Sequence, residues 1–181
     1  SDKEPMHIPI AVGMLDSSGK ELPLQLKGEP EPVGTTRVLN LQEWKQVFEF
    51  IHVPEKPIPS LPRGFSAPVR LKAGYTDEEQ AFLFAHDSDE FIRWDAGQNL
   101  FAKVLLQLIS GFQQDKEPSP DRSLLDPLKK TLLNPDLDKS FIAHALSLPS
   151  ESEMAIVMSE TGPIDPDAIH QARNFLTRSI A

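Results

Sequence analysis

The sequence predicts a mainly β region followed by helices: an Ig-like antiparallel β-sandwich, then the first helices of an α-superhelical domain of the armadillo or HEAT type. Apolar residues alternate with a period of two in the first part of the chain, and after His86 they recur every three or four residues. Short apolar runs in the first part are separated by Gly, Pro and polar residues, a spacing typical of a sandwich or a barrel. We therefore expect a β-sandwich domain over residues 1–86 and the start of a truncated helical domain over residues 87–181.

The amino-acid composition excludes several functional classes for this chain. The chain has 181 residues, 39% of them hydrophobic, enough for one ordinary domain or two small ones. It carries 18 basic and 27 acidic residues, a net charge of −9, which argues against binding nucleic acid or an anionic membrane. Without cysteine there is neither a disulfide scaffold nor a Cys-ligated zinc site. No apolar run approaches the roughly 20 residues of a membrane span. The start SDKEP lacks an initiator Met and a signal-like segment, so we expect an excised piece of a longer protein.

The first part contains the strand signals. Met6 to Met14 alternate as in a strand with one buried face, the segment DSSGK (16–20) supplies a turn, and ELPLQL (21–26) resumes the alternation, which together predict a hairpin. Five further runs bring the expectation to about seven strands: RVLNL (37–41), QVFEFIHV (46–53), SLPRGF (60–65), PVRLK (68–72) and QAFLFAH (80–86). Prolines at 54, 57, 59, 62 and 68 place that part at a sheet edge or in a connection.

The second part shows helical spacing. Phe91, Trp94, Gln98, Phe101, Leu105, Leu108 and Phe112 form one stripe. Asp87 and Glu90 resemble a capping box, so the helix should begin near Ser88. Shorter helices should start at Asp126 before Pro127, Asn134 before Pro135 and Asp165 before Pro166, and SESE (150–153) offers another cap. Four short helices in sequence favour a superhelical array over a closed bundle.

The sequence signals for a catalytic or metal-binding site are weak. A zinc peptidase needs H-E-x-x-H, but the histidines, at 7, 52, 86, 144 and 170, never fall four apart. HDSDE (86–90) suggests either a Ca²⁺ or Mg²⁺ clip or a capped helix start, and capping explains it better because the EF-hand spacing is absent. GFSAP (64–68) resembles a nucleophile elbow around Ser66, but Ala67 stands where the second Gly is needed, which favours a turn. We expect no catalytic, cofactor-binding or metal-binding residue in this chain.

The start of the long predicted helix carries Arg93, Trp94 and Asp95 side by side in the sequence. Trp94 on the apolar stripe suits a core anchor. Arg93 and Asp95 flank it, where they could lie in solvent or pair at a domain junction, and a guanidinium fork beside an indole favours the junction. Asp95 lacks a second acid or base nearby in the sequence for a catalytic role.

Several segments together resemble the region downstream of the catalytic domain in the bacterial aminopeptidase N family, the gluzincin alanyl aminopeptidases. They keep their order across nearly the whole chain: HIPIAVGMLDSSGKELPL (7–24), VLNL (38–41), FEF (48–50), PSLPRGFSAPVRL (59–71), FIRWDAGQNL (91–100), SLPSESEM (147–154) and IDPDAIHQARNFLTRSIA (164–181).

The resemblance implies a parent zinc metallopeptidase that removes N-terminal amino acids from peptides. Since neither an export signal nor cysteine appears in the sequence, we expect this parent to be a cytoplasmic bacterial enzyme. In such enzymes the zinc ligands, the general base and the amine-binding loop lie in a thermolysin-like domain upstream, so none is carried onto a residue here. Zinc is then a cofactor of the parent and not of this chain, and the chain is an inactive scaffold whose partners are the remaining domains of the parent. The helical domain would continue past Ala181, leaving the stripe of Ile169, Ala172, Leu176 and Ile180 bare and prone to self-association.

Two alternatives belong to other classes. The chain could be an independent peptide- or sugar-binding β-sandwich module with the helices as a docking platform. It could also be a self-sufficient hydrolase, and the sequence feature that favours this alternative is Ser66 in GFSAP.

Overall fold

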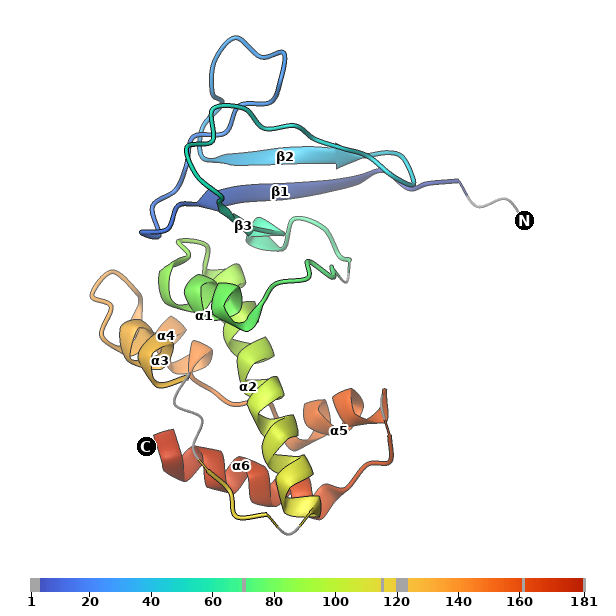
Figure 1. Ribbon diagram of the computed structural model, residues 1–181, viewed down its shortest axis with the longest axis vertical. Coiled ribbons are helices and arrows are strands. Elements are labelled where there is room, and N and C mark those ends of the chain that lie inside the picture. The colour runs from blue at the N-terminus through green and yellow to red at the C-terminus, as the bar shows by residue number, and fades with distance from the viewer. Residues whose placement is uncertain (1–3, 70, 115, 120–123, 161, 181) are drawn as a thin grey trace. The chain divides into compact units, whose positions relative to one another are not determined.

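The chain forms two compact units, one ending at Arg93 and the other beginning at Trp94. The computed structural model describes residues 4–69, 71–114, 116–119, 124–160 and 162–180. Figure 1 shows strands only in the early part of the chain, whereas the later part is helical.

A three-stranded antiparallel sheet organises the first unit. Its strands are β1 (Ile8–Leu15), β2 (Thr36–Leu41) and β3 (Ile58–Ser60), in the order β2-β1-β3 (Figure 1). Ile10 pairs with Leu39, and Gly13 pairs with Thr36 on one side and with Ser60 on the other. The predicted strand and its apolar face are confirmed from Ile8 to Met14, since Ile8, Ile10, Val12 and Met14 all belong to one hydrophobic core. The expectation of a single buried face that begins at Met6 is wrong: Met6 is exposed before the strand, and Ala11 and Leu15 on the other face are buried as well.

A second layer closes this core. Lys27 N donates to Glu49 O at 2.9 Å, and Ile51 N donates to Gln25 O at the same distance. This short ladder brings Leu24 and Phe50 against the side chains from β1. The predicted turn at residues 16–20 is confirmed as well, since the Asp16 carboxylate accepts hydrogen bonds from Ser18 N and Lys20 N, and Leu15 bridges to Glu21.

The predicted number of strands is wrong. Among the described residues there are three strands and two isolated bridges. The run at 21–26, expected to be the second strand of a hairpin, and the run at 46–53 take part only in the bridges, and the runs at 60–65 and 68–72 are mostly irregular. Prolines limit ladder pairing in this part of the chain. The edge prediction for the proline-rich segment is confirmed, because Pro59 lies in β3 at the edge of the sheet.

The run at 80–86 was expected to be a strand and is instead the end of a helix, α1 (Asp77–His86). Thr76 caps this helix in a complete capping box with Glu79. A seven-residue apolar run does not distinguish a strand from a buried helix, and here the cap decides. The change from strand to helix therefore comes at Asp77 rather than after His86.

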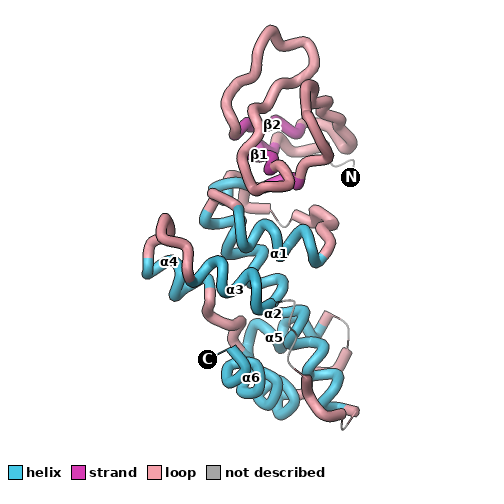
Figure 2. The backbone as a smooth tube through the Cα atoms, turned by 60° about the vertical axis from the view of Figure 1, so that its left-hand side comes forward, coloured by secondary structure: helices cyan, strands magenta, loops and turns pink. Residues whose placement is uncertain are grey.

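Five helices follow: α2 (Glu90–Gln113), α3 (Leu125–Leu132), α4 (Lys139–Ala145), α5 (Glu151–Ser159) and α6 (Pro166–Ile180) (Figure 2). The caps predicted at Ser150 and Asp165 are confirmed. The other two starts are wrong. Asp126 lies inside α3, which begins without a side-chain cap, and Asn134 instead forms a local turn by accepting from Asp136 N. The start of α4 is capped by Asp138.

The long stripe on α2 is confirmed at Phe101, Leu105 and Leu108, all buried. The burial extends further around the helix than predicted, because Leu100, Val104 and Ile109 are buried too. No helix in the described ranges has the length and apolar character needed to cross a membrane.

The expectation of a bare stripe on the last helix is wrong. Ile169, Ala172 and Leu176 are buried, because α6 packs on α5 and Phe175 meets Phe112 of α2 edge to face, with ring centroids 6.4 Å apart. The reason given for self-association through this helix is therefore removed.

Candidate functional site

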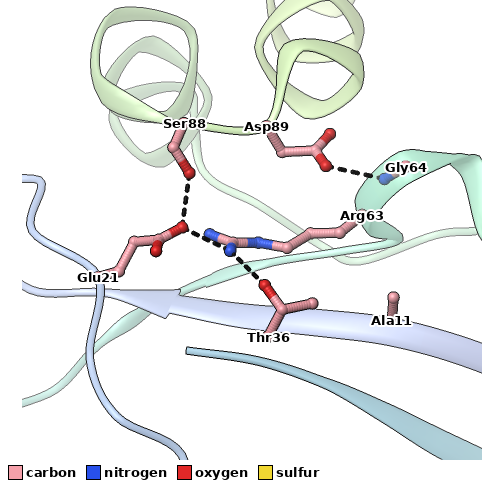
Figure 3. Close-up of a pocket in the computed structure, with 7 residues that line it drawn as sticks. All are labelled: Ala11, Glu21, Thr36, Arg63, Gly64, Ser88 and Asp89. Carbon is pink, nitrogen blue, oxygen red and sulfur yellow. Dashed lines mark hydrogen bonds and ion pairs between the residues drawn. The ribbon is translucent and has the colours of Figure 1, made fainter. Parts of the chain in front are cut away.

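A buried arginine organises the most polar part of the first unit. Arg63 begins the short 3₁₀ turn η1 (Arg63–Phe65), and its side chain is only 5% exposed. Its Nη1 donates to Glu21 Oε1 at 2.6 Å and to Thr36 Oγ1 at 2.8 Å (Figure 3). Its Nε donates to Ser60 Oγ at 2.8 Å. The side chain therefore connects the turn after β1 to β2 and β3.

The guanidinium lies directly on the backbone of β1. A Cβ atom added to Gly13 would lie 2.1 Å from Arg63 Cζ and 2.2 Å from Nε. No side chain fits between them, so glycine at position 13 is required for Arg63 to occupy this place.

A second buried charge faces Arg63. Asp87 is fully buried, and its Oδ1 lies 3.6 Å from Arg63 Nη2, beyond hydrogen-bond distance. Among the described residues, Arg63 Nη2 and Asp87 Oδ2 are buried without a hydrogen-bond partner. We call Arg63, Glu21, Thr36, Ser60 and Asp87 the Arg63 cluster.

The segment between α1 and α2 is bound to this cluster. Ser88 Oγ donates to Glu21 Oε1 at 2.5 Å, and Asp89 Oδ2 accepts from Gly64 N at 2.8 Å (Figure 3). Asp89 Oδ1 also accepts from Ile92 N at 3.0 Å, so Asp89 is the residue that caps α2. The prediction that Asp87 caps this helix is wrong: Asp87 instead accepts from Asp89 N at 2.9 Å.

A pocket of about 370 Å³ opens beside the cluster, lined by Ala11, Glu21, Thr36, Arg63, Gly64, Ser88 and Asp89 (Figure 3). Burial alone would raise the pKa of Glu21, but hydrogen bonds from Ser88, Thr35 and Arg63 outweigh it and lower that pKa. Burial raises the pKa of Asp87 despite the opposing hydrogen bonds from Ser60 and Asp89 and the nearby charge of Arg63.

This chemistry suits a structural cluster. Each carboxylate accepts from donors of the chain itself. The hydroxyl of Ser88 donates to Glu21, but the hydrogen bonds around Glu21 lower its pKa and so make this carboxylate a weak base. In the described ranges, no group of three or more His, Asp or Glu side chains is arranged to hold a metal ion.

The residues singled out from the sequence lie in separate places. Ser66 Oγ accepts from Ala11 N at 2.8 Å, a structural contact in the expected turn. Of the HDSDE segment, Asp87, Ser88 and Asp89 take part in the contacts described above. His7, His52 and His170 each bond to a different neighbour, Asn40, Gln25 and Glu151 respectively.

The three neighbours on α2 also have separate surroundings. Arg93 is buried and donates to the carbonyl oxygens of Ala85 and Asp87 at the end of α1. The ring of Trp94 stacks on that of His144, with centroids 5.7 Å apart. Burial raises the pKa of Asp95, against a hydrogen bond from Asn99.

Sequence reasoning missed the Arg63 cluster. Its members come from residues 21 to 87, and each is an unremarkable polar residue in its own segment. The one local signal was a glycine inside the strongly alternating strand, because an isolated strand glycine often marks a close approach of another group.

Comparisons with known proteins identify two family models that match this chain. A family model described as "Domain of unknown function (DUF3458) Ig-like fold" matches residues 1–74, and one described as "Domain of unknown function (DUF3458_C) ARM repeats" matches residues 77–181. These matches confirm the predicted fold class.

Whole-length similarity extends to named relatives. The chain is 37% identical over 181 residues to aminopeptidase N of Escherichia coli (strain K12), covering all of this chain and 20% of that protein. It is 37% identical over 180 residues to aminopeptidase N of Haemophilus influenzae, covering 99% of this chain and 20% of that protein. The chain thus spans about a fifth of the length of the curated relatives it matches, and the predicted resemblance to bacterial aminopeptidase N is confirmed.

A solved structure supports the fold. The crystal structure of Legionella pneumophila aminopeptidase A in complex with aspartic acid matches with a TM-score of 0.72 and 24% identity, covering 100% of this chain and 19% of that chain. Because the ARM-repeat model matches residues 77–181, more than half of the chain, the chain belongs to the DUF3458_C family, and its residues 1–74 match the model of the Ig-like DUF3458 domain.

Proposed function

We propose that this chain is a non-catalytic part of a zinc aminopeptidase that removes N-terminal amino acids from peptides, and that it joins the catalytic domain to the C-terminal helical domain. The observation that carries the proposal is the match to aminopeptidase N along the entire chain but along only a fifth of the relative. In this proposal the zinc ligands and the peptide site belong to other parts of the same polypeptide, in the cytoplasm.

The polar chemistry of the first unit supports a scaffold role. Arg63, Glu21 and Asp89 fix the beginning of α2 to the sheet through hydrogen bonds of their side chains. The hydroxyl of Ser88 does reach a carboxylate, that of Glu21, but the lowered pKa of Glu21 makes it a weak base for activating a nucleophile. A segment that positions neighbouring domains needs such rigidity, since small misplacements around an active site lower activity.

Two measurements test the proposal. The gene should encode an H-E-x-x-H sequence upstream of Ser1, and its full-length product should hydrolyse alanyl-p-nitroanilide in a chelator-sensitive manner. The 181-residue chain with zinc should release no product above the buffer blank. Chelator-sensitive turnover by this chain alone would contradict the proposal.

A variant at Ser66 tests the hydrolase alternative. In the full-length protein, Ser66→Ala should retain activity because the hydroxyl only accepts a backbone hydrogen bond. Complete loss of turnover in a folded Ser66→Ala protein would instead support a serine nucleophile in this chain.

A further inference from the structure

Three apolar side chains of the first unit are almost fully exposed. Met6 is 77%, Trp44 is 74% and Val47 is 81% exposed, and we call these residues the Trp44 patch. Large apolar side chains usually bury most of their surface, and Trp in particular is highly buried on average.

The register of the sheet puts Met6 and the start of the loop that holds Trp44 and Val47 at one end of the sheet. Ile8 pairs with Leu41, so the chain before Ile8 and the chain after Leu41 leave the sheet at the same end (Figure 1). Met6 lies two residues before Ile8, and the loop with Trp44 and Val47 follows Leu41. Gln42 N donates to Gln46 Oε1 at 2.9 Å within this loop. The loop is therefore held in a turn before any partner binds, which reduces the entropy lost on docking.

We propose that the Trp44 patch is the surface on which the catalytic part of the same polypeptide docks. The inference rests on the proposed function, because the relatives that match this whole chain are about five times longer. Trp is also the residue type most enriched among side chains that dominate interface energies.

The size of the patch favours a tethered occupant over a free one. Three side chains offer roughly 500 Å² of surface, below the roughly 800 Å² per partner of a stable interface between separate proteins. A covalently connected domain avoids most of the translational and rotational cost of association, so a small apolar anchor is sufficient for it. A second copy of this chain lacks that advantage.

Hydroxyl-radical footprinting of the full-length enzyme and of the 181-residue chain tests the proposal. In the 181-residue chain, Met6 and Trp44 should oxidise fast and the fully buried Met154 slowly, which gives a matched methionine control. In the full-length enzyme, the oxidation rates of Met6 and Trp44 should fall by at least about tenfold, as expected for a desolvated anchor. Equal rates for Trp44 in both proteins would overturn the proposal.

A double substitution gives a second measurement. Trp44→Gln with Val47→Gln should leave the Tm of the 181-residue chain unchanged within about 1 °C. In the full-length enzyme the same substitutions should raise the oxidation rate of Met6 towards its rate in the 181-residue chain. A Met6 oxidation rate that stays slow in the substituted full-length enzyme would contradict docking at the patch.

The outcomes separate the two proposals. An active full-length zinc aminopeptidase with an exposed Trp44 refutes only the docking surface, whereas a full-length product without aminopeptidase activity refutes the proposed function. Protection of Trp44 in the 181-residue chain together with a dimer mass would identify a second copy as the occupant and also overturn the inference.

Discussion

The Arg63 guanidinium and the Asp87 carboxylate face each other across 3.6 Å in the first unit, with both side chains almost fully withdrawn from solvent. This distance keeps their Coulomb attraction but excludes a hydrogen bond between them. Each retains one buried polar atom without a hydrogen-bond partner among the described residues. Their charges therefore depend on one another, and on Glu21, for compensation.

Removing the guanidinium should strongly destabilise the chain. Arg63→Met keeps much of the aliphatic stem but leaves Asp87 and Glu21 without their cation, and breaking a buried pair in this way typically costs about 3–5 kcal/mol. Urea denaturation measures the free energy of unfolding. The control is Lys27→Met at the exposed pair Lys27–Glu49, where we expect a loss below about 1 kcal/mol. Equal losses in the two variants would show that the Arg63 cluster contributes no more than a surface ion pair.

A methyl group at position 13 should displace Arg63 from the sheet. Gly13→Ala would place Cβ 2.1 Å from Arg63 Cζ, so we expect a loss of about 1–3 kcal/mol, as for an overpacked core. Gly111→Ala is the matched control because nothing lies within 4 Å of its Cβ position in α2, and alanine there should be neutral or stabilising by up to about 1 kcal/mol. Thermal unfolding of both variants gives the comparison. A Gly13→Ala variant as stable as the natural chain would mean that Arg63 is not held against β1.

The features that local sequence determines were predictable. The period of two in β1, the Asp16 turn and the caps at Ser150 and Asp165 each depend on residues within a few positions of one another. The strand prediction for 80–86 was wrong because a short continuous apolar run fits a buried helix equally well, and the decisive Thr76–Glu79 capping box lies just upstream. Asn134 failed because Asn before Pro favours a turn as readily as a helix start.

The Arg63 cluster was not predictable because its contacts span the whole first unit. Arg63 and Glu21 are 42 residues apart, and Ser88 and Glu21 are 67 residues apart. No periodic pattern or local motif links such positions; only the fold brings them together. Arg93 is a different case, because its partners are only six and eight residues before it; they lie at the end of the preceding helix, which the periodic pattern of α2 does not indicate.

Asp87 should make stability fall as the pH rises. Its pKa in the folded chain is raised by burial above the usual 3.8, so the folded chain holds this proton more tightly than the unfolded chain. The stabilisation from that proton is fully present below pH 3.8 and is lost as the pH rises through the folded-state pKa. The free energy of unfolding of the natural chain minus that of Asp87→Asn should therefore decrease from pH 3.5 towards neutrality. A flat difference would contradict a raised pKa.

Glu21 should show the opposite pH dependence. Burial opposes its ionisation, but hydrogen bonds from Ser88, Thr35 and Arg63 lower its pKa below the usual 4.5. Its stabilisation is present above pH 4.5 and is lost as the pH falls through the folded-state pKa. The free energy of unfolding of the natural chain minus that of Glu21→Gln should accordingly shrink as the solution is acidified below pH 4.5. Circular dichroism at matched urea concentrations measures both differences, and slopes of the same sign for the two variants would contradict these assignments.

Arg93 should act as a cap for α1 from the neighbouring helix. Its Nε and Nη2 donate to Asp87 O at 2.9 and 2.6 Å, and Nη1 donates to Ala85 O at 3.1 Å, so one fork satisfies two carbonyl oxygens that the end of a helix leaves free. Arg93→Met removes all three bonds inside a buried site and should cost about 3 kcal/mol or more. Arg93→Lys keeps the charge without the planar fork, so its free energy of unfolding should lie between those of the natural chain and of Arg93→Met. The control is Arg173→Met, which removes a half-buried bond from Nε to Pro149 O and should cost about 1 kcal/mol. Hydrogen exchange should localise the Arg93→Met effect to the last turn of α1; unchanged exchange there would show that the carbonyl contacts do not hold the helix end.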